Sequence, residues 1–192
     1  MKVEIKPPYV PFSQHEWCCV SAVLQMIMYR RGIKLMSQED IGYELGLIVP
    51  RKDKKMFNRV RTGKRPSGGY GTRIYIKKYS INSFFKRHKI KLVKNHVYTE
   101  DLKEAKKLII SNIKKGNDLI ICFNYRKLYK TGHSTGHVSL ISSFDTKKNI
   151  VTLIDPAEIV PEYRKVSLKK LLDTIKYHGK SNWGGFWVVK SR

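Results

Sequence analysis

Four residues in this sequence have side chains suited to nucleophilic attack on a carbonyl group: Gln14, Cys19, His137 and Asp155. Cys19 lies where an apolar helical pattern begins, and the partial positive charge of a helix start favours a thiolate. His137 follows a glycine at the start of a strand-like run, and its imidazole can act as the base. Asp155, 18 residues later, ends the next strand-like run and can orient that imidazole. The amide of Gln14 can stabilise an oxyanion together with the backbone N–H of the cysteine.

Each of these assignments has an alternative. Cys18 competes with Cys19 for the role of nucleophile, and either cysteine can instead be a small buried residue of an amphipathic helix. His133, in the segment TGHSTGHVSLI, is a second candidate for the base. Asp155 can cap the turn that follows it, and Gln14 can be an ordinary polar loop residue. The order Gln, Cys, His, Asp along one chain favours the catalytic interpretation.

The same segments contain four potential metal ligands, namely Cys18, Cys19, His133 and His137. Adjacent cysteines lack the Cys-x2-Cys spacing of zinc knuckles, so we expect no metal site. We expect no cofactor either. Cys122, within the apolar run LIICFN, is expected to be a core residue of a strand.

The surrounding sequence has to place these residues on helices and strands. A helical pattern of apolar residues begins at the cysteine pair and ends at Gly32, and Ser37 with Asp40 forms a capping box for a second helix. Further helices are expected within 79–90, 99–116 and 167–179, and strands at 118–124, 137–144, 149–155 and 185–190. Helices first and strands later indicate an α+β fold with a largely antiparallel sheet. The turn DTKKN then brings His137 beside Asp155.

The segment that begins at Cys19, CVSAVLQMIMYRRG, resembles the motif of a known family. It has small, apolar, Met and Gly residues at the family's positions, at Ala22, Leu24, Met26 and Gly32. The segments GHVSLI and VTLIDPA resemble the family's histidine and aspartate segments. The chain thus resembles the papain-like cysteine peptidases, most closely the bacteriocin-processing double-glycine leader peptidases and their stand-alone relatives. Two features depart from the pattern: Val20 stands where the family usually has glycine, and Gln14 lies one residue closer to Cys19 than is usual.

The resemblance implies a papain-like α+β fold, with a helical N-terminal half packed against a C-terminal antiparallel sheet and the active-site cleft between them. It implies that Cys19 is the nucleophile, His137 the base, Asp155 the group that orients it and Gln14 the oxyanion donor. We therefore expect hydrolysis of a peptide bond in a peptide or protein substrate through a thioester. Two alternatives remain open: an acyltransferase, transglutaminase or amidase of this fold, and an inactive peptidase-like module that binds an anionic partner such as nucleic acid.

Length and composition predict one domain over residues 1–192. Of the 192 residues, 41% are hydrophobic, which suffices for a folded core and excludes a disordered chain. The N-terminal segment lacks the apolar region of a signal peptide, and no apolar run is long enough to cross a membrane. Three cysteines give no readable disulfide framework. We therefore expect a cytoplasmic protein with reduced thiols.

The formal net charge of +24 is distributed unevenly. Residues 51–94 contain 16 lysines and arginines and a single acid, Asp53, and residues 50–75 are expected to form a basic, glycine-rich loop. This charge is either a solvated surface or a site for an anionic partner, such as nucleic acid or an acidic protein. No base-reading motif accompanies it. If the loop binds a polyanion, Lys64, Arg65 and Arg73 are expected to contribute.

Overall fold

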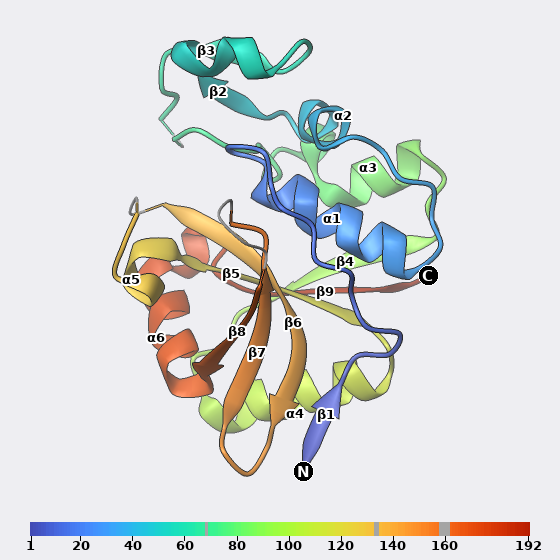
Figure 1. Ribbon diagram of the computed structural model, residues 1–192, viewed down its shortest axis with the longest axis vertical. Coiled ribbons are helices and arrows are strands. Elements are labelled where there is room, and N and C mark those ends of the chain that lie inside the picture. Colours follow the sequence, from blue (N-terminus) through green and yellow to red (C-terminus); the bar gives the residue numbers. More distant parts are fainter. Residues whose placement is uncertain (68, 133–134, 158–161) are drawn as a thin grey trace.

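A seven-stranded antiparallel sheet forms the centre of the structure, a computed structural model shown in Figure 1. The strand order is β4 (Leu92–Val97), β9 (Gly185–Ser191), β5 (Asp118–Asn124), β6 (Gly136–Asp145), β7 (Ile150–Asp155) and β8 (Glu162–Ser167). β1 (Lys2–Glu4) pairs with the far end of β6, and β2 (Ile48–Pro50) pairs in parallel with β3 (Arg61–Gly63) in a separate small sheet. The structure describes residues 1–192 except 68, 133–134 and 158–161.

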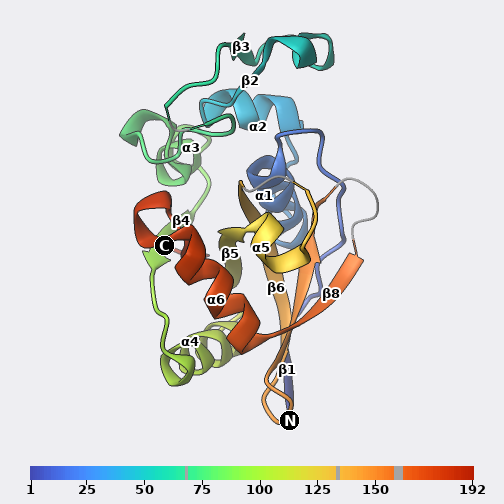
Figure 2. The ribbon, with the colours of Figure 1, turned by 90° about the vertical axis from the view of Figure 1, so that its left-hand side faces the viewer.

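Helices cover both faces of the large sheet (Figure 2). One face forms an apolar core with α1 (Cys19–Arg30), α2 (Gln38–Glu44) and α3 (Ile81–Arg87). The other face packs against α4 (Leu102–Lys114), α5 (Tyr125–Tyr129) and α6 (Leu168–His178). Short 3₁₀ helices lie at η1 (Arg51–Met56), η2 (Lys77–Tyr79) and η3 (Lys180–Asn182). The predicted α+β arrangement, with N-terminal helices on a largely C-terminal antiparallel sheet, is confirmed.

The two cores follow from the alternation of side chains along the central strand. All seven residues of β5 are buried, because helices cover both faces of the sheet there. Ile120 and Cys122 belong to the core beneath α1, whereas Leu119, Ile121 and Phe123 belong to the opposite core. The prediction that Cys122 is a core strand residue is therefore confirmed.

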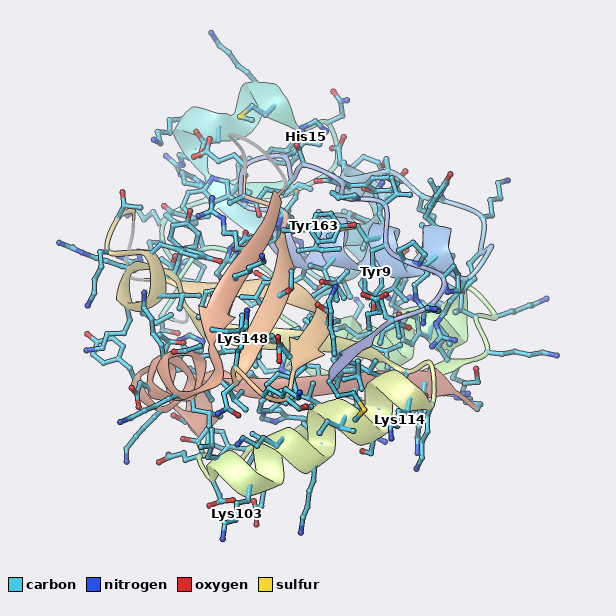
Figure 3. The ribbon with its side chains drawn as sticks, turned by 60° about the horizontal axis from the view of Figure 1, so that its bottom comes forward. Tyr9, His15, Lys103, Lys114, Lys148 and Tyr163 are labelled. Carbon is cyan, nitrogen blue, oxygen red and sulfur yellow. The ribbon has the colours of Figure 1, made fainter. Side chains whose placement is uncertain are left out.

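The helices are amphipathic, as α4 illustrates. Ala105, Ile109 and Ile113 recur at helical spacing and are buried against the sheet. Lys103 and Lys114 lie on its exposed side (Figure 3). None of the helices in the described ranges is long and apolar enough to cross a membrane.

The predicted strands all form, but five others, β1, β2, β3, β4 and β8, had no clear signal in the sequence. β4 is an edge strand with a mixed pattern, in which only Leu92 is fully buried. A strand with one partner and one covered face need not show a continuous apolar run. β1 and β8 are short and rich in charged residues, and they form because the ends of β6 and β7 offer free strand edges.

The basic segment 50–75 is more structured than the predicted loop. It contains η1 and β3, and Phe57 and Val60 pack with Cys18 in a small third core. Arg73 is buried and donates hydrogen bonds to backbone carbonyls of its own segment, the shortest at 2.6 Å. The expectation that Arg73 is available to bind a polyanion is therefore wrong, since its guanidinium already holds the segment together.

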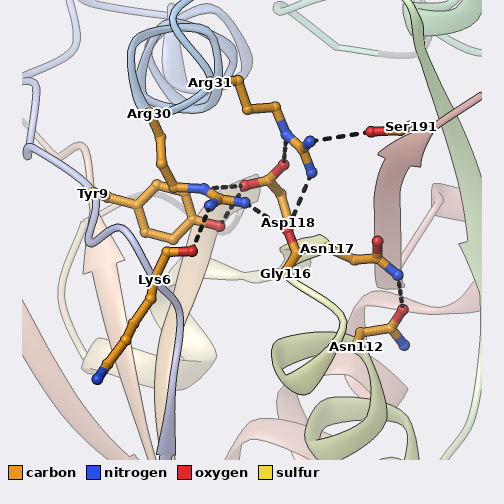
Figure 4. A network of polar contacts seen from close by, with 9 residues as sticks. All are labelled: Lys6, Tyr9, Arg30, Arg31, Asn112, Gly116, Asn117, Asp118 and Ser191. Carbon is orange, nitrogen blue, oxygen red and sulfur yellow. Dashed lines mark hydrogen bonds and ion pairs between the residues drawn. The ribbon is translucent and has the colours of Figure 1, made fainter.

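The C-terminal end of α1 is fixed by the buried carboxylate of Asp118, the first residue of β5 (Figure 4). Arg30 Nε donates to its Oδ1 at 2.8 Å, and Arg31 Nε donates to its Oδ2 at 2.5 Å. The hydroxyl of Tyr9 donates to Oδ1 at 2.8 Å. This cluster ties the N-terminal segment and α1 to the sheet, and so it helps to position the helix that carries Cys19.

Candidate active site

The two adjacent cysteines have different surroundings. Cys18 is fully buried in the third core, and this burial raises the pKa of its thiol to about 12. Cys19 is the first residue of α1 and is half-buried, and its thiol lies close enough to His137 to help raise the pKa of that imidazole. The structure therefore places Cys19, and not Cys18, beside the predicted base.

The turn that presents Cys19 is held by the residue two positions before it. Trp17 has a φ of 69°, in the left-handed region that costs a non-glycine residue about 1–2 kcal/mol. Its indole Nε1 donates to Asp53 Oδ2 at 2.9 Å, and its ring packs edge-on against Tyr70, with centroids 5.4 Å apart. The single acid of the basic stretch thus stabilises the start of α1.

His137 and Asp155 come together on the hairpin of β6 and β7. These strands are antiparallel neighbours, with Leu140 paired to Ile154. Nε2 of His137 donates to Oδ1 of Asp155 at 2.7 Å, and the two residues are 7% and 0% exposed. Because the aspartate engages Nε2, the other ring nitrogen, Nδ1, is left for the thiol of Cys19.

The electrostatics of this pair favour the ionised forms of both residues. Burial alone lowers the pKa of His137, but the charge of Asp155, the hydrogen bond to Asp155 and the nearby thiol of Cys19 together raise this pKa to about 10. Burial alone raises the pKa of Asp155. The charge of His137 and its hydrogen bond have a larger, opposite effect, so the pKa of Asp155 is lowered to about 2. At neutral pH the imidazolium and the carboxylate therefore form a buried ion pair.

Asp155 accepts three further hydrogen bonds. Tyr129 Oη donates to Oδ2 at 2.5 Å, Ser139 Oγ donates to Oδ2 at 3.0 Å, and the backbone N–H of Ala157 donates to Oδ1 at 2.9 Å. The bond from Ala157 is the turn cap that the sequence offered as an alternative role. Asp155 therefore caps its turn and holds His137 at the same time.

Two of these partners of Asp155, Ser139 and Tyr129, were not predicted from the sequence. Ser139 lies two residues after His137 and so shares its strand face, a signal that strand periodicity could have supplied. Tyr129 lies on α5, and its approach to Asp155 depends on how this short helix packs. No local sequence signal marks it.

Gln14 lies next to the aspartate turn, because its backbone N–H donates to Pro156 O at 2.8 Å. Its amide oxygen Oε1 is buried and has no hydrogen-bond partner in the described part of the chain. Gln38 on α2 holds both neighbours of Gln14: its Nε2 donates to Ser13 O and its Oε1 accepts from the N–H of His15, each at 2.7 Å. The segment carrying Gln14 is thus clamped beside the site by a glutamine that the sequence did not single out.

The structure brings Cys19, His137 and Asp155 into one connected array, with Gln14 on the adjoining segment. His133, the alternative base, lies outside the described residues. A protonated imidazole next to a thiol at a helix start is an arrangement that stabilises a thiolate nucleophile.

The chain is similar to a family of peptidases and to two solved structures. A family model described as "Peptidase_C39 like family" matches residues 6–182. A crystal structure of a Bacillus anthracis protein described as a C39-like peptidase superposes with a TM-score of 0.64 at 17% identity, covering 100% of this chain and 98% of that one. Xylellain, a cysteine protease from Xylella fastidiosa, superposes with a TM-score of 0.50 at 13% identity, covering 100% of this chain and 86% of that one. None of the curated proteins matches the chain.

Proposed function

This chain belongs to the Peptidase_C39 like family and has a papain-like fold. We propose that it hydrolyses a peptide bond with Cys19 as the nucleophile. The observation that carries the proposal is the position of His137, which lies beside the thiol of Cys19 and hydrogen-bonds to Asp155. A nucleophile, a base and a group that orients the base are the parts required for acyl transfer by a thiol.

In the resting state the proton of the Cys19 thiol resides on His137. The raised pKa of His137 supports this, because an imidazole that holds its proton tightly can keep it when it faces a thiolate. Asp155 stabilises the resulting imidazolium through its bond to Nε2, so that the Nδ1 proton is directed at the sulfur.

In the acylation step the thiolate Sγ of Cys19 attacks the carbonyl carbon of the scissile bond. A C–S bond forms, the C–N bond breaks, and His137 passes its proton to the leaving amine. Water then attacks the thioester, with His137 accepting a proton from it, and Cys19 is regenerated. The oxyanion formed in each step is stabilised by the backbone N–H of Cys19, which has no intrahelical acceptor at the helix start, and by the amide of Gln14.

The role of Gln14 leads to a prediction about rate. Gln14→Ala should lower kcat by about 10²–10³-fold and change KM little, because the amide acts on charge that develops only in the transition state. The measurement is steady-state hydrolysis of a peptide identified as a substrate. A matched control is Gln25→Ala, since the amide of Gln25 donates to Met36 O in the segment that follows α1. Equal kcat in Gln14→Ala and wild type would remove Gln14 from the mechanism.

The proposed activity can be tested with a peptide library prepared from a digested proteome and analysed by mass spectrometry. The wild-type protein should generate new peptide termini, and Cys19→Ala should generate none. Products joined to an added amine, in place of free carboxyl termini, would instead assign the same array to acyl transfer. A complete absence of products, with no labelling of Cys19 by iodoacetamide, would favour an inactive binding module.

A further inference from the structure

A second feature of the described chain is a pocket of about 360 Å³ between α5 and α6 that contains a cluster of positive charge. Its lining residues are Asn124, Arg126, Lys127, Lys130 and Tyr177. Three of these are cations and none is an acid. Arg126, Lys127 and Lys130 are exposed, and their side chains make no ion pair or hydrogen bond within the described residues.

The cations are held together by their place on one short helix. Arg126 and Lys127 are adjacent on α5 and Lys130 follows its last residue, so their side chains start within roughly 6 Å of one another along the helix axis. Lys127 Nζ lies 5.0 Å from the centroid of the Tyr177 ring on α6, which orders that side chain at one wall of the pocket. Within the described residues, the cluster therefore presents three cationic donors with no acid lining the pocket to neutralise them.

The pocket adjoins the array that contains His137. α5 carries Tyr129, which donates to Asp155, and Tyr125, whose ring centroid lies 4.9 Å from that of His137. The lining residue Asn124 pairs with Gly136, the residue immediately before His137 on β6. A chain bound across His137 can therefore reach the pocket within a few residues, since an extended peptide advances about 3.3 Å per residue.

We propose that this pocket binds a carboxylate side chain of the peptide substrate, so that the enzyme prefers substrates with Asp or Glu a few residues from the scissile bond. The proposal deepens the proposed function and rests on it. Arg126 can bind a carboxylate with two parallel hydrogen bonds, and the two lysines supply further charge. A compact group of three cations fits a side-chain carboxylate, whereas a nucleic-acid backbone calls for cations spaced along a groove.

Direct binding tests the proposal independently of turnover. The protein is the Cys19→Ala variant, and the probes are a fluorescein-labelled peptide with two glutamates and its glutamine counterpart, followed by anisotropy at physiological ionic strength. Replacing Arg126, Lys127 and Lys130 by glutamine should weaken binding of the acidic peptide about tenfold, because three charge contacts are lost together. Binding of the glutamine peptide should already be weak and should not change.

The overall charge of +24 requires a matched control. Replacing Lys103, Lys107 and Lys114 of α4 by glutamine removes the same charge from an exposed helix that makes no contribution to the pocket. This variant should bind the acidic peptide within about twofold of the parent, because surface charges more than about 8 Å away are screened at this ionic strength. Equal losses in both triple variants would overturn the proposal. The proposal would also be overturned if a single-stranded oligonucleotide of equal charge bound more tightly than the acidic peptide and lost its affinity only when Arg126, Lys127 and Lys130 are replaced.

The cleavage preference of the enzyme provides a second test of the pocket. In the peptide library, sites cut by the wild type should be enriched in Asp or Glu at one or two fixed positions, and the α5 variant should lose this enrichment while still folding, as judged by thermal unfolding. Cleavage without any acidic preference would overturn the pocket proposal and leave the peptidase intact. Absence of cleavage would count against the proposed function alone, and the binding arm would then decide the pocket.

Discussion

Replacing His137 by alanine is expected to lower peptide hydrolysis by about 10⁴–10⁶-fold, because the thiol loses both its proton acceptor and the acid for the leaving amine. Cys19→Ala should have an effect of the same size, and the double variant should be no worse than either single one, since the two residues act as a unit. The measurement is kcat/KM on one peptide from the library, with folding checked by thermal unfolding.

A matched control for this prediction is His88→Ala. His88 is an exposed histidine that directly follows α3, and its loss should leave kcat/KM unchanged. Full activity in His137→Ala, combined with loss of activity in His133→Ala, would move the role of base to the other histidine of the segment.

The second large effect concerns stability. Asp118→Asn should lower the free energy of unfolding by about 3–5 kcal/mol, because Arg30 and Arg31 lose their shared anion. Arg30 is the more affected, since its side chain is 4% exposed and its charge remains buried without a counter-ion. Because native domains are stable by only about 5–15 kcal/mol, such a loss should be large in a urea titration.

The matched control here is Glu44→Gln. Glu44 pairs with Arg87 at 2.6 Å, but the two side chains are 26% and 38% exposed, so the pair is screened by water. Its loss should cost at most about 1 kcal/mol. If Asp118→Asn costs no more than Glu44→Gln, the cluster in Figure 4 does not anchor α1 in the way its geometry implies.

Much of the fold was accessible from the sequence because the central elements are strongly patterned. The apolar runs of β5, β6 and β7 and the amphipathic spacing of α4 and α6 predict their positions closely, and Ser37 caps its helix as expected, by accepting from the N–H of Asp40. The family resemblance drawn from the motif at Cys19 is also confirmed. Edge strands such as β4 were missed, because burial on one face leaves little trace in the sequence.

The limits of sequence reasoning are clearest around the site. Chain order and the β6–β7 hairpin were sufficient to place His137 beside Asp155, whereas the bond from Tyr129 depends on how α5 packs. Gln38 bonds to His15, which lies 23 positions earlier in the chain, and to Ser13, which lies 25 positions earlier. No local sequence pattern predicts these two contacts. The charge of residues 51–94 was evident from the sequence. The hydrogen bonds of Arg73 within its own segment and the bond from Trp17 to Asp53 required three-dimensional information.

The central claim is that His137, held by Asp155, maintains Cys19 as a reactive thiolate. The most direct test is the pH dependence of iodoacetamide alkylation, with the modified cysteine identified by mass spectrometry. The pKa of His137 is raised, so its imidazolium persists as the pH rises and is lost only near pH 10. The pKa of Asp155 is lowered, so its carboxylate persists down to about pH 2. The ion pair therefore spans the whole range from pH 6 to 9.

We expect Cys19 alone to be modified in the native protein, at a rate that varies by less than about threefold between pH 6 and 9. In His137→Ala the rate should instead rise about tenfold per pH unit toward the value near 8.5 that is typical of a free thiol. Cys18 and Cys122 should react only after unfolding, because both are buried. A Cys19 rate that climbs tenfold per pH unit in the wild type, or modification of Cys18 first, would contradict the account.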